Sequence, residues 1–509
     1  MIGPLLALIA AAWAAPEAPV EEEAPAVLTE QDVGQLLVSV AKVAATGDRD
    51  ATAALLVDIV SDPLKAPAHG QAWMMLADNL QAFELPYASL IAFGHAIDGA
   101  PQAAGPKLGE MLELADDLGE SGPISEALGK NVGLPIPDKI RNRMATIAGR
   151  HHLAAGNYGP ALGILMMGDS EQPGFADVEL LRGVVLSQQG RYGDALAPML
   201  TAQALGEKDD RESRFRNRAT VNVARAFYAT GNYGQAINYY AKVERGSDVW
   251  LDAQFERAWA HFRGKDTNGT LAMVFNHSSP FFDDYYYPEA HLLRAYSLFL
   301  MCKFPEASKE MDAFQARWEP VKALIDGIAM SPAEAFADVQ AFRSDGQHEL
   351  PAYLIRSFRY DDRFEDATRS IESADADLAR AEGLSNEVGR FADKLIRSQR
   401  AARIAAEGQR VLDRVQSAQT ELDDMLAGIQ ITRIDLLSLE AEMYERAAAT
   451  GVLDYGDKVG KLRQMRKDRR GFRVWKWQGE YWADEVGWYV FGARPDCPSS
   501  MSSTPTTGG

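Results

Sequence analysis

The chain has 509 residues, enough for several average domains or for one extended repeat array. Its apolar fraction of 47% and charged fraction of 24% exclude a wholly disordered protein. The formal net charge is −20, so we do not expect the whole chain to bind nucleic acid, because affinity for phosphate requires net positive charge. Its two cysteines, Cys302 and Cys497, are too few for a disulfide framework or a four-ligand zinc site.

The N-terminal residues 1–14 form a short apolar segment that ends in Ala12-Trp13-Ala14, a small-x-small pattern typical of signal-peptide cleavage. The sequence therefore predicts a signal peptide over 1–14 and export to the periplasm or the envelope, if the source is a bacterium with two membranes. The alternative is an unusual cytoplasmic N-terminus, because no Lys or Arg precedes the apolar core. Residues 15–28 are rich in Ala, Pro and Glu and predict an acidic linker.

Helical periodicity begins at Thr29, and alternating runs of β-branched residues are absent, so we expect an all-α protein. Of 24 prolines, 21 lie in residues 1–351 and none in 352–494. Because proline disrupts helix interiors, the first part should contain many short helices and the second part a few long ones. We assign 29–330 to helical repeats, 331–365 to connecting helices and 366–449 to long helices.

A spaced pattern of Gly, any residue, an aromatic, two residues and Ala recurs in the first part. It begins at Gly156, Gly190 and Gly231, and weaker copies begin at Lys265 and Cys302. Small residues stand seven positions before four of these starts, at Gly149, Gly183, Ala224 and Ala295. Glycine can end one helix in the left-handed conformation, and small residues let paired helices approach closely, so the copies should be helix pairs that stack.

This pattern resembles the tetratricopeptide repeat family over about residues 140–315, and more weakly over 70–100. The resemblance implies a right-handed superhelix whose concave surface binds proteins or peptides without catalysis. We expect the repeat tyrosines to be mostly buried, which leaves the groove-facing residues unassigned.

The long-helix region carries a heptad seam: Val415, Leu422, Ile429, Leu436 and Met443 are each seven apart. Ala418, Met425, Thr432 and Leu439 follow three residues later, which is typical of a helix that meets another helix. Two outcomes are open: an arrangement within the chain, either as a hairpin for which Gly408 offers a fold-back point or packed on the repeats, against an intermolecular coiled coil through 366–449.

Residues 450–497 combine a basic stretch from Lys458 to Lys476 with Trp475, Trp477, Trp482 and Trp488. We expect this segment to dock on the acidic body, with the Trp cluster covering its hydrophobic end. Contact of 458–488 with anionic lipid or an envelope polymer is the first alternative, and nucleic acid the least favoured. Residues 498–509 are predicted to be a disordered tail.

Few residues are candidates for catalysis, metal binding or modification, and most of them have a structural explanation. His151 and His152 are adjacent and should not share a metal, and His348-Glu349 lacks the rest of a zinc-protease helix. Asp283 and Asp284 with Tyr285–Tyr287 could line a polar pocket, although a loop acid pair before packing aromatics is favoured. Cys302 is interpreted as a packing residue of a repeat turn. Asn268 and Asn276 match glycosylation acceptors.

The sequence thus predicts no catalytic residue, metal or cofactor. The leading interpretation is a noncatalytic scaffold or adaptor of the bacterial envelope that binds a protein partner through the repeat groove. The alternative is an envelope spacer that self-associates through 366–449.

Overall fold

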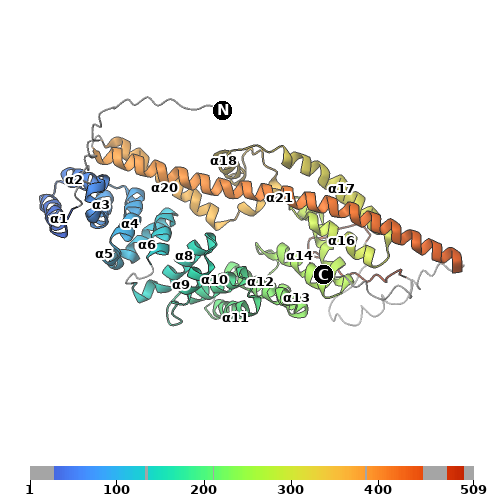
Figure 1. Cartoon of the computed structure of the whole chain (residues 1–509). Coiled ribbons are helices and arrows are strands. Elements are labelled where there is room, and N and C mark those ends of the chain that lie inside the picture. The colour runs from blue at the N-terminus through green and yellow to red at the C-terminus, as the bar shows by residue number, and fades with distance from the viewer. Residues whose placement is uncertain (1–27, 132–135, 210, 385–386, 451–477, 498–509) are drawn as a thin grey trace, which may run out of the picture.

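The computed structural model describes residues 28–131, 136–209, 211–384, 387–450 and 478–497, and these contain helices and no strand. Helix pairs form a solenoid, and a long helical hairpin then runs back along it (Figure 1). The predicted signal peptide, nearly all of the acidic linker, the basic stretch 458–476 and the predicted tail lie outside the described residues.

The solenoid consists of α1 (Glu30–Ala44), α2 (Arg49–Ser61), α3 (His69–Ala82), α4 (Pro86–Gly99), α5 (Pro101–Ala104), α6 (Leu108–Leu118), α7 (Gly122–Lys130), α8 (Arg141–Ala154), α9 (Tyr158–Leu165), α10 (Phe175–Gln188), α11 (Tyr192–Lys208), α12 (Ser213–Ala229), α13 (Tyr233–Tyr240), α14 (Trp250–Arg263), α15 (Thr267–His277), α16 (Pro288–Leu300) and α17 (Phe304–Asp326). The remaining α-helices are α18 (Pro332–Arg343), α19 (Ala352–Ile355), α20 (Asp362–Gly383) and α21 (Glu387–Thr450). Short 3-10 helices are η1 (Pro63–Ala68), η2 (Gly105–Lys107), η3 (Asp138–Ile140), η4 (Pro280–Phe282) and η5 (Arg356–Phe358).

The first residue of every predicted repeat copy lies in the turn between two paired helices, in the left-handed conformation. The φ angles are +72° at Gly156, +74° at Gly190 and +78° at Gly231. Lys265 and Cys302 adopt the same conformation, at +62° and +55°, without being glycine. The last residue of the pattern is fully buried in each copy: Ala161, Ala195, Ala236, Thr270 and Ala307. The predicted tetratricopeptide-type helix pairs are therefore confirmed.

Further left-handed turns between paired helices escaped the sequence pattern, and two of them extend the series that begins at Gly156. Glu84 joins α3 to α4 at φ +59°, and Gly119 joins α6 to α7 at φ +66°. From Glu84 to Cys302 successive turns are 35, 37, 34, 41, 34 and 37 residues apart. The pattern missed both turns because Pro86 and Ser121 stand where the aromatic residue is expected.

The expected burial of the repeat tyrosines is wrong. Tyr192 is 41% exposed, and Tyr158 and Tyr233 are partly exposed, whereas Phe304 is buried. Each tyrosine begins the second helix of its pair, next to an exposed turn, so part of its side chain stays in contact with solvent.

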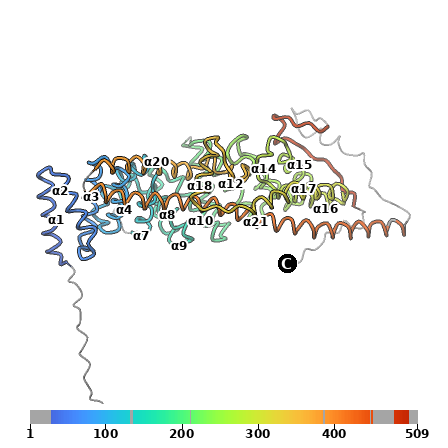
Figure 2. Tube along the Cα trace, turned by 90° about the horizontal axis from the view of Figure 1, so that it is seen from above, coloured from blue at the N-terminus to red at the C-terminus, as the bar shows by residue number. Residues whose placement is uncertain are grey.

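The helices α20 and α21 form a hairpin that spans the solenoid (Figures 1 and 2). The 64 residues of α21 correspond to a length of about 96 Å at ~1.5 Å per residue. This helix contacts α2 and α4 near its start and α18, α17 and α16 farther along. No helix among the described residues is both long and apolar enough to cross a membrane.

The heptad seam of α21 packs inside the chain. Val415, Ala418, Leu422, Ile429 and Leu436 are at most 5% exposed and share one hydrophobic cluster with residues of α17 and α18. Packing on the repeats, one of the two open outcomes, is therefore what the structure contains.

The fold-back considered near Gly408 does not occur, because α21 continues through this residue and the hairpin turn lies between Gly383 and Glu387. Gly408 instead allows α21 to approach α18 closely. A Cβ atom there would lie 1.7 Å from the carbonyl oxygen of Pro332. The glycine thus serves a helix crossing rather than a turn.

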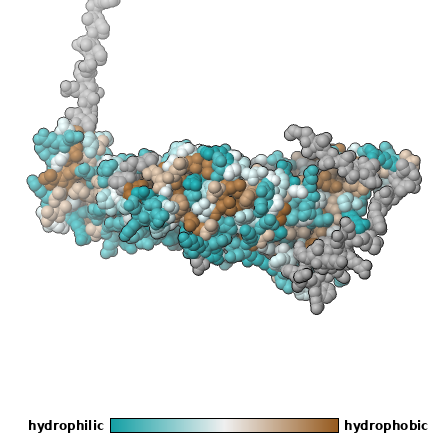
Figure 3. Space-filling view, turned by 90° about the horizontal axis from the view of Figure 1, so that it is seen from below, coloured by the Kyte–Doolittle hydropathy of each residue, from teal (hydrophilic) through white to brown (hydrophobic). Residues whose placement is uncertain are grey.

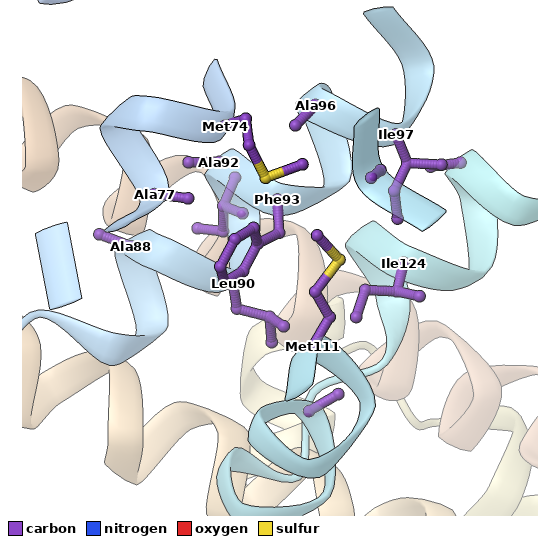
Figure 4. Packing of buried hydrophobic residues seen from close by; sticks show 14 of the residues in the cluster. Met74, Ala77, Ala88, Leu90, Ala92, Phe93, Ala96, Ile97, Met111 and Ile124 are labelled. Atoms are coloured by element: carbon purple, nitrogen blue, oxygen red, sulfur yellow. The ribbon is translucent and has the colours of Figure 1, made fainter. Parts of the chain in front are cut away.

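The N-terminal repeats share a core with the hairpin. Four hydrophobic side chains pack together in Figure 4: Met74 of α3, Phe93 of α4, Met111 of α6 and Ile124 of α7. The same cluster includes residues of α20 and of the first turns of α21. The hairpin therefore completes the solenoid's hydrophobic core as well as covering it.

Candidate functional site

The concave side of the solenoid and the returning helices enclose a cleft of about 940 Å³. Its walls come from α12, α14, the segment before α16, the α19–η5 region and α21. Five arginines, five tyrosines and three aspartates line it: Arg214, Arg218, Arg245, Arg356, Arg414, Tyr285, Tyr286, Tyr287, Tyr353, Tyr360, Asp248, Asp252 and Asp361. The cleft is thus net basic and aromatic in a chain whose formal charge is −20.

Arg214 and Arg218 stand one turn apart on α12 and connect the solenoid to the hairpin. Both bind Asp248, with N–O distances of 3.1 Å from Arg214 Nε and 2.9 Å from Arg218 Nη2. Both also pair with Asp362 at the start of α20, at 3.2 Å for Arg218. These side chains are 32% and 39% exposed, so each guanidinium retains a solvent-facing surface.

The tyrosine run between η4 and α16 lines the cleft, as one of its two interpretations predicts. The Tyr286 hydroxyl donates to the carbonyl of Ala418 on α21 at 3.2 Å. The Arg356 guanidinium lies over the Tyr285 ring, 4.2 Å from its centroid. These contacts hold the flat ring faces along the wall.

The two acids before the tyrosines act as ion-pair partners. Asp283 pairs with Arg317 at 3.4 Å, and Asp284 pairs with Arg356 at 3.6 Å. Neither is among the residues that line the cleft, so the predicted polar pocket contains the tyrosines without the acid pair.

A half-buried carboxyl–phenol pair lies on one side of the cleft. Burial raises the pKa of the Asp252 carboxyl, and the Tyr287 hydroxyl donates a hydrogen bond to it. Burial, and then the charge of Asp252, raise the pKa of Tyr287. The phenol therefore stays protonated at neutral pH, and the pair fixes α14 to the start of α16.

The cleft continues along the solenoid into a second hollow of about 480 Å³. The two share Arg214 and Arg218, and the second adds Arg150 and Arg225. Arg225 forms a bidentate ion pair with Glu256, with its shorter N–O distance at 2.5 Å. The joined hollows provide an elongated surface with repeated guanidinium groups.

The sequence analysis missed these arginines, although a signal was present. Arg214, Arg218 and Arg225 are four and seven residues apart, which places them within about 40° of one another around α12 at roughly 100° per residue. Such a spacing indicates a row of like charges along one side of a helix.

The other candidates are not brought together into a site. His152 Nε2 lies 3.0 Å from the carbonyl oxygen of Gly129, and His348 Nδ1 lies 2.8 Å from that of Leu350. In the described ranges, no group of three or more His, Cys, Asp or Glu side chains is placed to hold a metal ion.

The described part of the C-terminal segment, residues 478–497, is called the strap below. It packs along α14–α16: Val486 is buried, and Tyr481 and Tyr489 contact the ring of Phe275. Trp482 and Trp488 are 59% and 55% exposed. The strap therefore packs on the body through its tyrosines, and the expected cover by tryptophans is not found at Trp482 and Trp488. The basic stretch that was expected to dock, together with Trp475 and Trp477, lies outside the described residues.

Cys302 and Cys497 form a disulfide, with 5.0 Å between their Cα atoms. The interpretation of Cys302 as a packing residue was therefore incomplete: it occupies a repeat turn and is also covalently joined to the strap. Sequence reasoning missed this bond because 195 residues separate the two cysteines and no local signal pairs them.

No protein-family model and no curated protein matches the sequence. Solved structures with partial similarity include nearly identical TPR-like repeats from Podosopora anserina, at 16% identity over 37% of this chain and 99% of that chain, with a TM-score of 0.31. A Rap protein complexed with competence and sporulation factor matches at 13% identity over 78% of this chain and 99% of that chain, with a TM-score of 0.26. The TPR domain of P58(IPK) matches at 14% identity over 76% of this chain and 99% of that chain, with a TM-score of 0.18. The solenoid is defined by the helix pairs of this chain and the left-handed turns that join them.

Proposed function

We propose that this protein is a noncatalytic scaffold of the bacterial cell envelope that binds a protein partner through the arginine- and tyrosine-lined cleft. The observation that carries the proposal is the concentration of five arginines and five tyrosines on the concave side of an acidic solenoid. Arginine and tyrosine are enriched where protein interfaces gain most of their binding energy.

The shape and charge of the cleft favour an extended segment with acidic side chains. Guanidinium groups bind carboxylates in a planar, bidentate geometry, and tyrosine rings offer apolar contact at low entropic cost. The joined hollows extend this surface from α14 toward α10. The face of the molecule seen in Figure 3 is mostly hydrophilic, with separate hydrophobic patches.

The proposed location in the envelope has two supports. The apolar segment 1–14 has a small-x-small end, and Cys302 pairs with Cys497 in a disulfide. Disulfides persist mainly in oxidising compartments such as the periplasm. The heptad seam that the competing spacer function would use is buried against α17 and α18, and this favours the scaffold over the spacer.

Site-specific photocrosslinking of the full chain tests the proposal. A photoreactive phenylalanine analogue is placed at Tyr360, which lines the cleft and is 70% exposed, and separately at Tyr192, which is 41% exposed on α11. In native envelope extract we expect one stoichiometric protein adduct from position 360 and none from position 192.

A charge variant supplies the control. Arg356→Gln removes a cleft guanidinium and should lower the adduct yield about tenfold, since a charge-assisted hydrogen bond contributes roughly 1.5 kcal/mol. Arg397→Gln removes an arginine that is 57% exposed on α21 and does not line the cleft, and it should have no effect. Equal yields from both tyrosine positions, or an unchanged yield with Arg356→Gln, would contradict the proposal.

A further inference from the structure

Several side chains of the body hold the strap by hydrogen bonds to its backbone. Asn276 Oδ1 accepts a hydrogen bond from the Gly487 N–H at 2.8 Å. The Asn268 amide accepts from the Ala493 N–H at 3.0 Å and donates to the Ala493 carbonyl at 3.1 Å. Both asparagines are the glycosylation candidates of the sequence, and in this state their amides are engaged by the strap.

Most apolar contacts of the strap stay partly exposed. Val486 is the one fully buried residue of the strap, whereas Tyr489, Phe491 and Ala493 are only partly buried against the body's hydrophobic clusters. Beside the hydrogen bonds, Lys303 pairs with Asp496 at 2.9 Å. Noncovalent contacts of this kind open locally far more easily than a helix core does.

The disulfide ties the end of the strap to the turn between α16 and α17. Cys302 is 8% exposed, whereas Cys497 is partly exposed. The chain holds these two cysteines and no others, so this bond is its one site for thiol–disulfide exchange. The partly exposed Cys497 sulfur is the one open to an attacking thiolate.

The strap also forms part of the cleft. Ala483 and Val486 line the cleft, and the cleft residue Arg245 donates hydrogen bonds to the carbonyls of Ala483 and Asp484, at 3.0 Å for Asp484. Gly487 lies against Trp250, where a Cβ atom would come within 2.8 Å of the indole ring. The strap therefore covers one guanidinium and one indole that belong to the cleft wall.

We propose that the Cys302–Cys497 disulfide is a latch that keeps the strap over the cleft, and that its reduction releases the strap. Release exposes Arg245, Trp250 and the amides of Asn268 and Asn276, which contact the strap in the oxidised protein. The oxidised protein has the smaller cleft, and the reduced protein the larger one.

The chemistry requires a dithiol reductant. One thiolate of the reductant attacks Cys497 Sγ, and the S–S bond breaks with Cys302 leaving as a thiolate that is then protonated. The second thiol of the reductant, as a thiolate, attacks the mixed disulfide and releases Cys497 as a thiol. The protein gains two protons and two electrons, and the reductant becomes a disulfide.

Hydrogen–deuterium exchange of the full chain, before and after reduction with dithiothreitol, tests the latch. We expect amides of residues 484–496 to exchange at least tenfold faster after reduction, together with faster exchange in residues 245–252. Exchange in α3 and α4, which are distant from the strap in sequence and do not contact it, should stay unchanged. The readout needs no ligand, so it does not depend on the proposed function.

Two variants separate the latch from side effects of the reductant. Cys497→Ser should reproduce the reduced state without dithiothreitol. Adding Asn268→Ala to Cys497→Ser should raise strap exchange by a further threefold or more, since it removes both bonds to Ala493. The matched control is Asn222→Ala, whose amide donates to the Arg218 carbonyl inside α12.

Two results would overturn the inference. Unchanged exchange in residues 484–496 after reduction would mean that the noncovalent contacts alone hold the strap. Faster exchange throughout the solenoid would mean that the disulfide stabilises the whole fold, rather than controlling the strap.

Discussion

At the scale of single residues, the backbone conformation of the repeat turns explains which positions require glycine. Gly156, Gly190 and Gly231 satisfy a left-handed turn without strain, whereas Lys265 adopts it with a side chain. The left-handed conformation destabilises the folded state by roughly 1–2 kcal/mol for a residue other than glycine. Glycine offsets part of this difference, because it loses more conformational entropy on folding.

Lys265→Gly should therefore stabilise the protein by about 0.5–1 kcal/mol. Gly231→Ala, at φ +78°, should destabilise it by about 1 kcal/mol, and a Cβ there meets no neighbouring atom. Denaturant unfolding of the two variants measures both changes. A destabilising Lys265→Gly would show that the lysine side chain makes a contact worth more than the strain.

A second residue-scale prediction concerns His277 on α15, next to Asn276. Burial lowers the pKa of His277 to about 4, and its ring contacts Phe255 and Tyr287. The unfolded chain binds a proton at about pH 6.5, before the folded chain does, so stability is full above that pH and is lost as the pH falls toward 4.

Between pH 7.5 and pH 5 we expect His277 to account for a loss of about 2 kcal/mol. His277→Gln should remove this part of the pH dependence, whatever its effect on stability at pH 7.5. Unfolding free energies of both proteins across this range provide the test, and parallel curves would show that another group is responsible.

At the scale of elements, the seam of α21 illustrates how a heptad pattern is used inside one chain. Leu422 is fully buried in the cluster shared with α17 and α18, whereas Leu437 on the same helix is 57% exposed. The heptad pattern indicates that the helix packs against other helices. Gly408 allows it to approach α18 closely.

Leu422→Ala should lower the free energy of unfolding by about 2–5 kcal/mol, because it leaves a cavity in a packed interface. Leu437→Ala should change it by less than about 0.5 kcal/mol. Light scattering should give the same mass for both variants and for the parent chain. A variant-dependent change in mass would show that the seam contributes to an assembly of several copies.

At the scale of the whole molecule, α20 supplies what the N-terminal repeats lack. Helix α4 begins with Pro86 and has no side-chain cap of its own. Asp377 on α20 accepts hydrogen bonds from the backbone N–H groups of Tyr87 at 2.8 Å and Ala88 at 3.2 Å. The hairpin thus caps a helix that lies 290 residues earlier in the sequence.

Asp377→Ala should cost about 1–3 kcal/mol, since it leaves two buried N–H groups without acceptors. Asp375→Ala is the control: this residue is 52% exposed and pairs with Arg400 at the surface, so its loss should cost under about 1 kcal/mol. Thermal unfolding followed by exchange in α4 should show early loss of protection only for Asp377→Ala.

The sequence by itself determined the all-α class, the five repeat turns from Gly156 to Cys302 and the buried seam positions of α21. Each of these is a local property, because a left-handed turn or a heptad depends on residues within a few positions of one another. The turns at Glu84 and Gly119 were missed where the local pattern lacks its aromatic residue.

Only the tertiary structure decided where the hairpin turns, which arginines meet in the cleft and how the cysteines pair. Arg214 and Asp362 are 148 residues apart, and Cys302 and Cys497 are 195 apart. No propensity or spacing relates such residues, since their proximity follows from the curvature of the stacked pairs and the return of α21 along them. The sequence therefore specifies the repeating unit, and the packing of the units creates the cleft.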